Sequence, residues 1–99
     1  MTLIHIDKLT GSTSSGSLVV TTTARLQGIL RQLIVSPATD TTTWDIKMTD
    51  ADSIISLQRT GRTGLLSEEL ALPLHGTYTI TVSGASADEV FTIKLIVQE

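Results

Sequence analysis

The stretch GTYTITVSGASADEVFTIKLIVQE, residues Gly76 to Glu99, decides the class of fold. From Thr77 to Val82, threonines alternate with Tyr, Ile and Val, which is the period-two pattern of a strand with one buried face. A small, polar segment at 84–88 follows, and a second alternating run extends from Phe91 to Val97. We therefore predict a β-hairpin with a connection of about five residues. Because a two-stranded hairpin is only marginally stable alone, further strands must cover its apolar face.

The composition favours one small all-β domain. Ninety-nine residues suffice for one core, and 40% of them are hydrophobic while 17% are charged. Threonine, valine and isoleucine are frequent, and β-branched side chains pack well in strands. Turn residues separate seven or eight short strand-like segments along the chain. We predict an all-β fold, an antiparallel β-sandwich of seven or eight strands with an Ig-like or small jelly-roll topology.

Two of these segments give clear expectations for side-chain orientation. The alternation over 42–49 places Trp44, Ile46 and Met48 on the buried face of a strand. The segment 67–74 alternates as well but contains Pro73. Because proline cannot donate a ladder hydrogen bond, we expect that strand at a sheet edge, or the proline at the strand's end.

Residues 26–36 fit two patterns. Their apolar residues recur at the spacing of an amphipathic helix, but Gly28 and the proline that follows the segment disfavour a helix. As a strand, the segment directs Ile29 and Leu33 inward, with Gly28 at a bulge or tight bend. Arg31 would share the inward face, which counts against the strand. We favour the strand because the segments on both sides are strand-like.

The N-terminal part differs from the rest in composition. A strand or arm followed by a flexible linker rich in Gly and Ser (residues 1–17) precedes the sandwich domain (residues 18–99). The arm carries the apolar residues Leu3, Ile4 and Ile6. We expect this segment either to pair within the fold or to reach a neighbouring subunit.

The sequence carries no catalytic or metal-binding motif. It has no cysteine, which excludes disulfides and thiolate-based metal sites. His5 and Asp7 would share one strand face, and we interpret them as surface residues. We interpret Asp50 and Asp52 as turn residues rather than the start of a calcium loop. We expect no enzymatic activity and no cofactor.

Two classes of partner are disfavoured by charge and hydropathy. The net charge of −3 provides no basic field for nucleic acid. No apolar run is long enough to span a membrane, and the first residues lack the pattern of a signal peptide. We expect neither a nucleic-acid nor a membrane partner.

Exposed apolar and charged residues suggest an interface instead. Val90 and Ile96 fall on the face opposite Phe91, so apolar surface stays uncovered unless the first strand covers it. Arg59 and Arg62 lie in the Arg-Thr-Gly repeat of 59–64, a loop that could hold a phosphate or an acidic partner, or be a plain hairpin tip. The candidate interface residues are Leu3, Ile4, Ile6, Arg59, Arg62, Val90 and Ile96.

A series of segments carries a family resemblance. They read GILRQLIVSP (28–37), TTWDIKMTD (42–50), QRTG (58–61), PLHGTYTI (73–80), VFTI (90–93) and IVQE (96–99). In this order they resemble small β-sandwich virion structural proteins of tailed bacteriophages. The resemblance implies a role in assembly without catalysis.

From the resemblance we expect a capsid decoration (cement) protein that is made in the host cytoplasm and located in the virion. Its expected partners are further copies of itself, with a trimer favoured, and the major capsid protein. A neck, tail or fibre-associated module is the alternative. A carbohydrate-binding or adhesive sandwich is less favoured, because the chain has only three aromatic residues.

Overall fold

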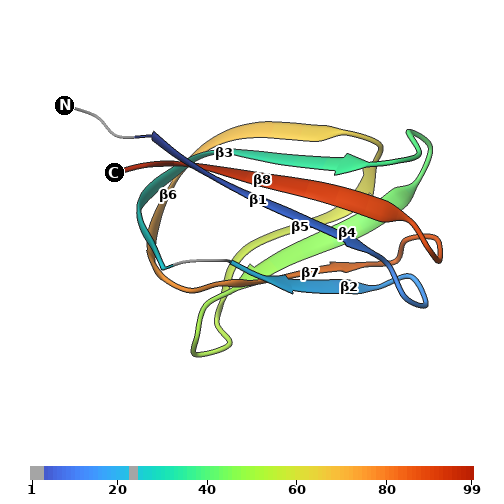
Figure 1. The fold of residues 1–99 in the computed structure, drawn as a ribbon, viewed down its shortest axis with the longest axis horizontal. Coiled ribbons are helices and arrows are strands. Elements are labelled where there is room, and N and C mark those ends of the chain that lie inside the picture. The colour runs from blue at the N-terminus through green and yellow to red at the C-terminus, as the bar shows by residue number, and fades with distance from the viewer. Residues whose placement is uncertain (1–3, 23–24) are drawn as a thin grey trace.

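In the computed structural model, residues 4–22 and 25–99 are described, and they form eight β-strands and no helix (Figure 1). The strands are β1 (Ile4–Ser12), β2 (Leu18–Thr21), β3 (Leu26–Pro37), β4 (Thr43–Thr49), β5 (Ile55–Thr63), β6 (Leu66–Gly76), β7 (Thr79–Ser83) and β8 (Val90–Gln98). They make two packed antiparallel sheets, which confirms the predicted all-β sandwich.

The order of the strands identifies the topology. One sheet has the order β1-β8-β3-β6 and the other the order β2-β7-β4-β5. The first half of the chain thus pairs with the second half in nested fashion, β1 with β8, β2 with β7, β3 with β6 and β4 with β5. This is the arrangement of a long antiparallel hairpin rolled into two sheets, the eight-stranded jelly roll. It decides between the two topologies that the sequence left open.

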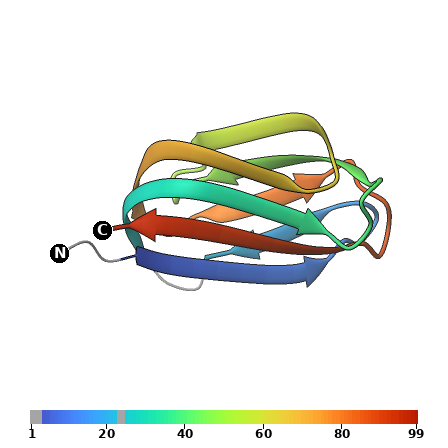
Figure 2. The same ribbon diagram turned by 90° about the horizontal axis from the view of Figure 1, so that it is seen from above.

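The expected hairpin over 76–99 is wrong. Both of its strands exist, but β7 lies in one sheet and β8 in the other, and the segment between them crosses from sheet to sheet (Figure 2). Their apolar faces meet across the core instead of lying side by side. Alternation shows which face of a strand is buried, but it does not show which strand is its hydrogen-bonded neighbour.

The core fills the space between the two sheets. Trp44, Ile46 and Met48 point into it from β4, as predicted, and each is at most 3% exposed. The ring of Trp44 meets Phe91 of β8 edge to face, with centroids 6.0 Å apart and an angle of 81° between the ring planes. Trp44 Nε1 donates a hydrogen bond of 3.0 Å to the backbone oxygen of Gly64, so the polar edge of the indole is satisfied.

Residues 26–37 form strand β3, with an irregularity that accounts for their helical spacing. The register with both β6 and β8 shifts between Leu30 and Gln32. Arg31 is an extra residue relative to β8, whereas in the pairing with β6 the extra residue lies on β6. The bulge turns Arg31 outward, where its Nε donates to Gln98 Oε1 at 2.6 Å. The bulge also shifts the alternation of inward and outward side chains, so that Leu30 before it and Leu33 after it are both buried. The expectation that Ile29 points inward is therefore wrong.

The segment predicted as a linker is anchored by hydrogen bonds to the connection between β7 and β8. Thr13 is 2% exposed, and its backbone N–H donates to Glu89 O at 2.8 Å. Its Oγ1 donates to Ser86 O at 2.6 Å and accepts from Glu89 N–H at 2.8 Å. Strand β1 before it pairs with β8 over its full length. In this structure β1 therefore belongs to the sandwich, and exchange of this strand between subunits stays a prediction.

We expect Gly28→Ala to destabilise the fold by about 3 kcal/mol. Gly28 has φ of 130°, and a Cβ there would lie 2.2 Å from Gln98 O. The control is Gly61→Ala, at φ 64° with no atom within 4 Å of the added Cβ, which should cost only about 1 kcal/mol. Urea unfolding of the three proteins measures both changes, and equal losses would contradict the assigned close approach.

Thr13→Val should lower the free energy of unfolding by about 2–3 kcal/mol, because it leaves the buried N–H of Glu89 and the partly buried C=O of Ser86 without their partner. Thr10→Val, at an exposed position of the preceding strand β1, should change it by less than about 0.5 kcal/mol. Thr13→Ser keeps the hydroxyl and should restore most of the loss. A Thr13→Val protein as stable as Thr10→Val would show that this connection does not anchor the sheets.

Candidate interaction surface

The predicted interface residues fall into two separate places. Ile4, Ile6, Val90 and Ile96 lie on the outer face of the sheet β1-β8-β3-β6, while Arg59 and Arg62 lie on β5 in the other sheet. Leu3 lies outside the described residues. The two groups therefore do not form one surface.

The outer face of β1 and β8 carries exposed isoleucines. Ile4 and Ile6 are each 57% exposed, and Ile6 lies directly opposite the half-buried Ile96 in the ladder between β1 and β8. Val90, 40% exposed, extends this face to the start of β8. Thr92 and Lys94 separate Val90 from Ile96, so the apolar patch proper consists of the isoleucines at one end of these strands. Exposed apolar patches are typical of an interface.

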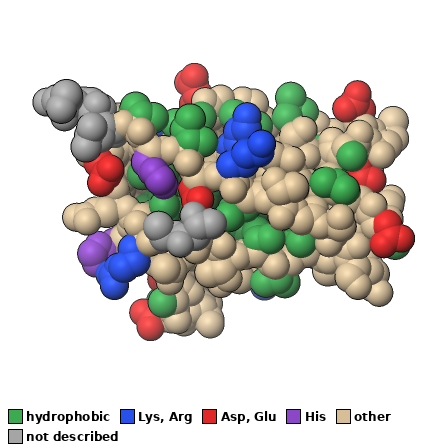
Figure 3. All heavy atoms as spheres, viewed as in Figure 1, with side chains coloured by type: hydrophobic (Ala, Val, Ile, Leu, Met, Phe, Trp, Pro, Cys, Tyr) green, Lys and Arg blue, Asp and Glu red, His purple; other side chains and the backbone are tan. Residues whose placement is uncertain are grey.

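Positive charge borders the isoleucines. Lys8 of β1 lies directly opposite Lys94 of β8. This pair is two positions along the ladder from the pair Ile6 and Ile96, on the same face of the sheet. In Figure 3, one group of Lys and Arg side chains lies at the upper centre of this side of the molecule, with hydrophobic side chains on either side, and another lies at the lower left. Two like charges in direct cross-strand register are unfavourable for the isolated domain. Their position suits contact with a partner that supplies acidic groups.

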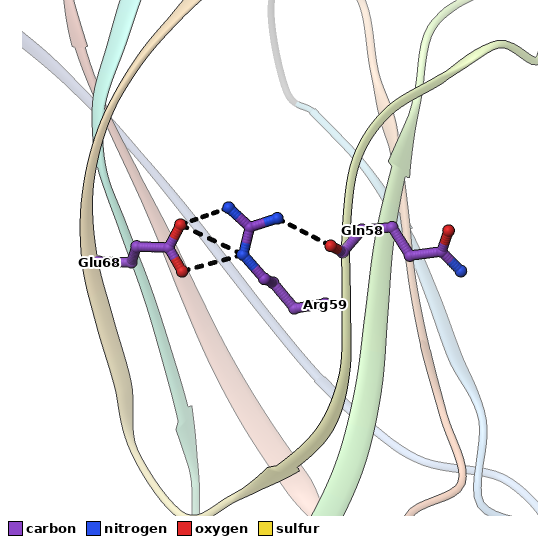
Figure 4. A network of polar contacts seen from close by, with 3 residues as sticks. All are labelled: Gln58, Arg59 and Glu68. Carbon is purple, nitrogen blue, oxygen red and sulfur yellow. Dashed lines mark hydrogen bonds and ion pairs between the residues drawn. The ribbon is translucent and has the colours of Figure 1, made fainter.

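At the opposite border of the sandwich, an ion pair joins the two sheets. Arg59 of β5 and Glu68 of β6 both sit at inward-facing positions, opposite Ile46 and Leu33 in their ladders. Arg59 Nε donates to Glu68 Oε1 at 3.0 Å and to Oε2 at 3.2 Å, and Nη2 forms an ion pair with Oε2 (Figure 4). Nη1 donates to the backbone oxygen of Gln58 at 2.8 Å. The guanidinium is thus held by the edges of both sheets.

The ion pair shifts the pKa of both side chains. Hydrogen bonding from Arg59 lowers the pKa of the Glu68 carboxyl, with the charges of Arg59 and Arg62 acting in the same direction and burial opposing them. The same hydrogen bond raises the pKa of Arg59. Both side chains keep 25–30% of their surface exposed, so solvent screens the pair and limits its effect on stability.

Arg62 lies beside this pair and also faces inward. It is opposite Trp44 in the ladder between β4 and β5, and its Nε is buried without a hydrogen-bond partner among the described residues. The sequence suggested that both arginines belong to an exposed loop. They lie within strand β5 instead, and the turn between β5 and β6 is confined to Gly64 and Leu65.

Glu68 was not among the predicted residues, although a signal was present. Glu68 falls in the alternating series of even-numbered positions whose other side chains pack on the core, namely Leu66, Leu70, Leu72 and Leu74. A charged residue at an inward position indicates a sheet edge, where the side chain can reach both a partner and solvent.

The described residues hold no group of three or more His, Cys, Asp or Glu side chains able to bind a metal. Asp50 Oδ1 accepts from the N–H groups of Asp52 and Ile54 at 2.9 and 3.0 Å, which is the predicted turn. No helix that could span a membrane occurs in the part of the chain that is described. A hollow of about 260 Å³ lies on the outer face of the second sheet, beside Asp45, Lys47 and Thr81. Asp45 Oδ1 accepts a hydrogen bond of 2.8 Å from the backbone N–H of Gly61 at this place.

We expect Glu68→Gln to lower the free energy of unfolding by up to about 1 kcal/mol near neutral pH. Because folding lowers the pKa of Glu68, the pair stabilises the protein above the ordinary pKa of the carboxyl, and this contribution is lost as the pH falls through the folded-state pKa. Unfolding measured from about pH 7 to about pH 3 should therefore show the two proteins converging in acid. Glu69→Gln, on the exposed outer side of β6, is the control and should have no such pH-dependent effect.

Comparison with known proteins shows the fold alone. No family model matches the chain, and no curated protein sequence matches it. Among solved structures, the periplasmic inhibitor of g-type lysozyme PliG from Aeromonas hydrophila is similar, with a TM-score of 0.54 and 16% identity over 93% of this chain and 86% of that one.

Two other structures are similar at TM-scores below 0.5. A chain of infectious bursal disease virus, Gx strain, matches at a TM-score of 0.46 and 13% identity; the match covers the whole of this chain and 32% of the viral chain. A carbohydrate-binding module described as CBM4 matches at 0.39 and 17% identity, over 93% of this chain and 82% of that one. At these identities a β-sandwich is shared with proteins of several functions, and the function of this chain has to be argued from its own surface.

Proposed function

We propose that this chain is a non-enzymatic structural protein of a bacteriophage particle, and most specifically a capsid decoration (cement) protein. It binds the outer shell as a small homo-oligomer, with the major capsid protein as its second partner. It is made in the host cytoplasm and is carried in the virion.

The observation that carries this proposal is the outer face of the sheet β1-β8-β3-β6. Ile4 and Ile6 are more than half exposed there, beside Ile96 and the facing lysines Lys8 and Lys94. A surface on which exposed isoleucines lie beside charged side chains suits contact with another protein. The jelly-roll topology supports the same proposal by analogy, because this fold recurs in capsid proteins.

Two alternatives have less support. A carbohydrate-binding or adhesive module needs exposed aromatic rings for stacking on sugars. The three aromatic residues of the chain, Trp44, Tyr78 and Phe91, are all buried, at 1%, 6% and 0% exposure. A neck, tail or fibre-associated module would use the same kind of face as a decoration protein, and it differs in copy number.

Copy number in particles of the virus that encodes the chain tests the proposal. A decoration protein should be present in numbers comparable with the major capsid protein, as measured by quantitative mass spectrometry of purified virions. A few copies per particle would favour the neck or tail. Absence from virions would overturn the proposal.

A matched pair of substitutions tests the face itself. Val90→Glu adds a charge to the outer face of the first sheet, and Val19→Glu adds the same charge at a 63% exposed position of β2 in the other sheet. Val90→Glu should weaken binding to undecorated shells at least about tenfold, because a buried, unpaired charge is costly at an interface. Val19→Glu should bind as the unmodified protein does, and the reverse result would place the contact on the second sheet.

A further inference from the structure

The four edge strands of the sandwich differ in how far they are protected from pairing with another chain. A sheet edge presents unpaired N–H and C=O groups, and proteins blunt it by proline, by short strands, by bulges or by inward-pointing charges. The sheets of this protein end at β1 and β6 and at β2 and β5. Figure 2 shows β1 running along one border of the molecule.

Three of these edges carry such protection. Strand β6 contains Pro73, at the edge position that its sequence predicted, and the inward-pointing Glu68. Strand β5 carries the inward-pointing Arg59 and Arg62, and its register with β4 shifts twice. Strand β2 has only four residues. Each of these features disfavours the addition of a further strand.

Strand β1 also carries an inward-pointing charge, because Asp7, which the sequence placed at the surface, is only 4% exposed. It is nevertheless the most regular of the four edges. It has nine residues, contains no proline, and keeps one continuous register with β8 from Ile4 opposite Gln98 to Ser12 opposite Val90. Its outward side chains include Ile4 and Ile6, both 57% exposed. The edge thus offers a regular row of backbone groups beside apolar surface.

We propose that a second copy of this chain pairs with the free edge of β1, antiparallel and about a two-fold axis centred on Ile6. The contact joins two four-stranded sheets into one sheet of eight strands. This inference rests on the proposed function, which includes a homo-oligomer, and it names the surface through which the copies meet.

The charges on β1 exclude two neighbouring registers, and the isoleucines favour a centre at Ile6. Opposed residues in an antiparallel pair point to the same face, so a two-fold pair centres on a residue. A centre at Asp7 or Lys8 places like charges directly opposite each other, which is unfavourable. A centre at Ile6 places Lys8 opposite Ile4 of the partner subunit and His5 opposite Asp7 of the partner subunit. No like charges then face each other among the described residues.

The same register extends the apolar face. Ile6 already lies opposite Ile96 within one subunit. Pairing about Ile6 places Ile6 of the partner subunit on the other side, followed by Ile96 of the partner subunit. Four isoleucines then form one row across the joined sheets, and the exposed surface of Ile6 is covered. Aliphatic cross-strand neighbours of this kind stabilise a sheet.

The absence of cysteine from the sequence allows a direct test. In Ile6→Cys, any disulfide must link two copies, and opposed Cα atoms about 4.5–5.5 Å apart are within the range for a disulfide. We expect mild oxidation to convert most of the protein to a covalent dimer. Thr10→Cys is the control, because its two copies would lie eight positions apart along the ladder, roughly 27 Å, and should stay monomeric on denaturing gels.

A mixed experiment checks the register. Ile4→Cys and Lys8→Cys should each cross-link poorly alone and should form a heterodimer when mixed, since these positions face each other. In parallel, light scattering of the unmodified protein should give a mass of two chains, and Ile6→Glu should give one chain with unchanged secondary structure. The trimer expected from the sequence is the competing assembly.

Three results would overturn the proposal. They are a monomer at all concentrations, equal cross-linking of Ile6→Cys and Thr10→Cys, or a trimer without cross-linking through Ile6. Each can occur while the protein still binds shells in the copy-number and Val90→Glu experiments, so failure of this contact and failure of the proposed function are distinguishable.

Discussion

The fold depends on strand β8, which is paired on both sides and packed on its inner face. Its inward side chains Phe91, Ile93, Leu95 and Val97 are at most 1% exposed. Its backbone is bonded to β1 along one edge and to β3 along the other. Because β8 is hydrogen-bonded to a neighbour on each side and its inner face is buried, it sets the position of β1 relative to the bulged strand β3. Gly28 approaches the end of β8 so closely that a side chain would not fit.

The sequence predicted the local pattern well and the pairing poorly. Alternation identified the buried faces of β4 and β8 and limited the topology to two sandwich types, because burial on one face repeats every second residue. It did not identify neighbours: β7 and β8 are adjacent in sequence but lie in different sheets. Nor did it locate the bulge, since one extra residue at Arg31 turns a strand's periodicity into a helix-like spacing of Leu26, Leu30 and Leu33. Both errors concern long-range register, which short-range spacing does not encode.

The candidate surface was predictable to a similar degree. Ile96 was expected on a face that could stay uncovered and Ile6 in the N-terminal arm, and the structure sets the two residues opposite each other. The arginines were expected in a loop, yet they bridge the sheet edges through Glu68. That role requires residues from β5 and β6 to meet across two sheets, and its one sign in the sequence is a charge at an inward position.

The two borders of the sandwich therefore differ in a way that bears on assembly. At the border of β5 and β6, register shifts and Pro73 disfavour further strands, whereas the border at β1 presents a regular edge. If both edges of the first sheet were open, copies could add head to tail and grow into a fibre. With one edge blocked, pairing through β1 is self-complementary and uses the open edge of both partners at once. Such a contact closes at two copies and leaves the outer face of the joined sheet available to a third surface.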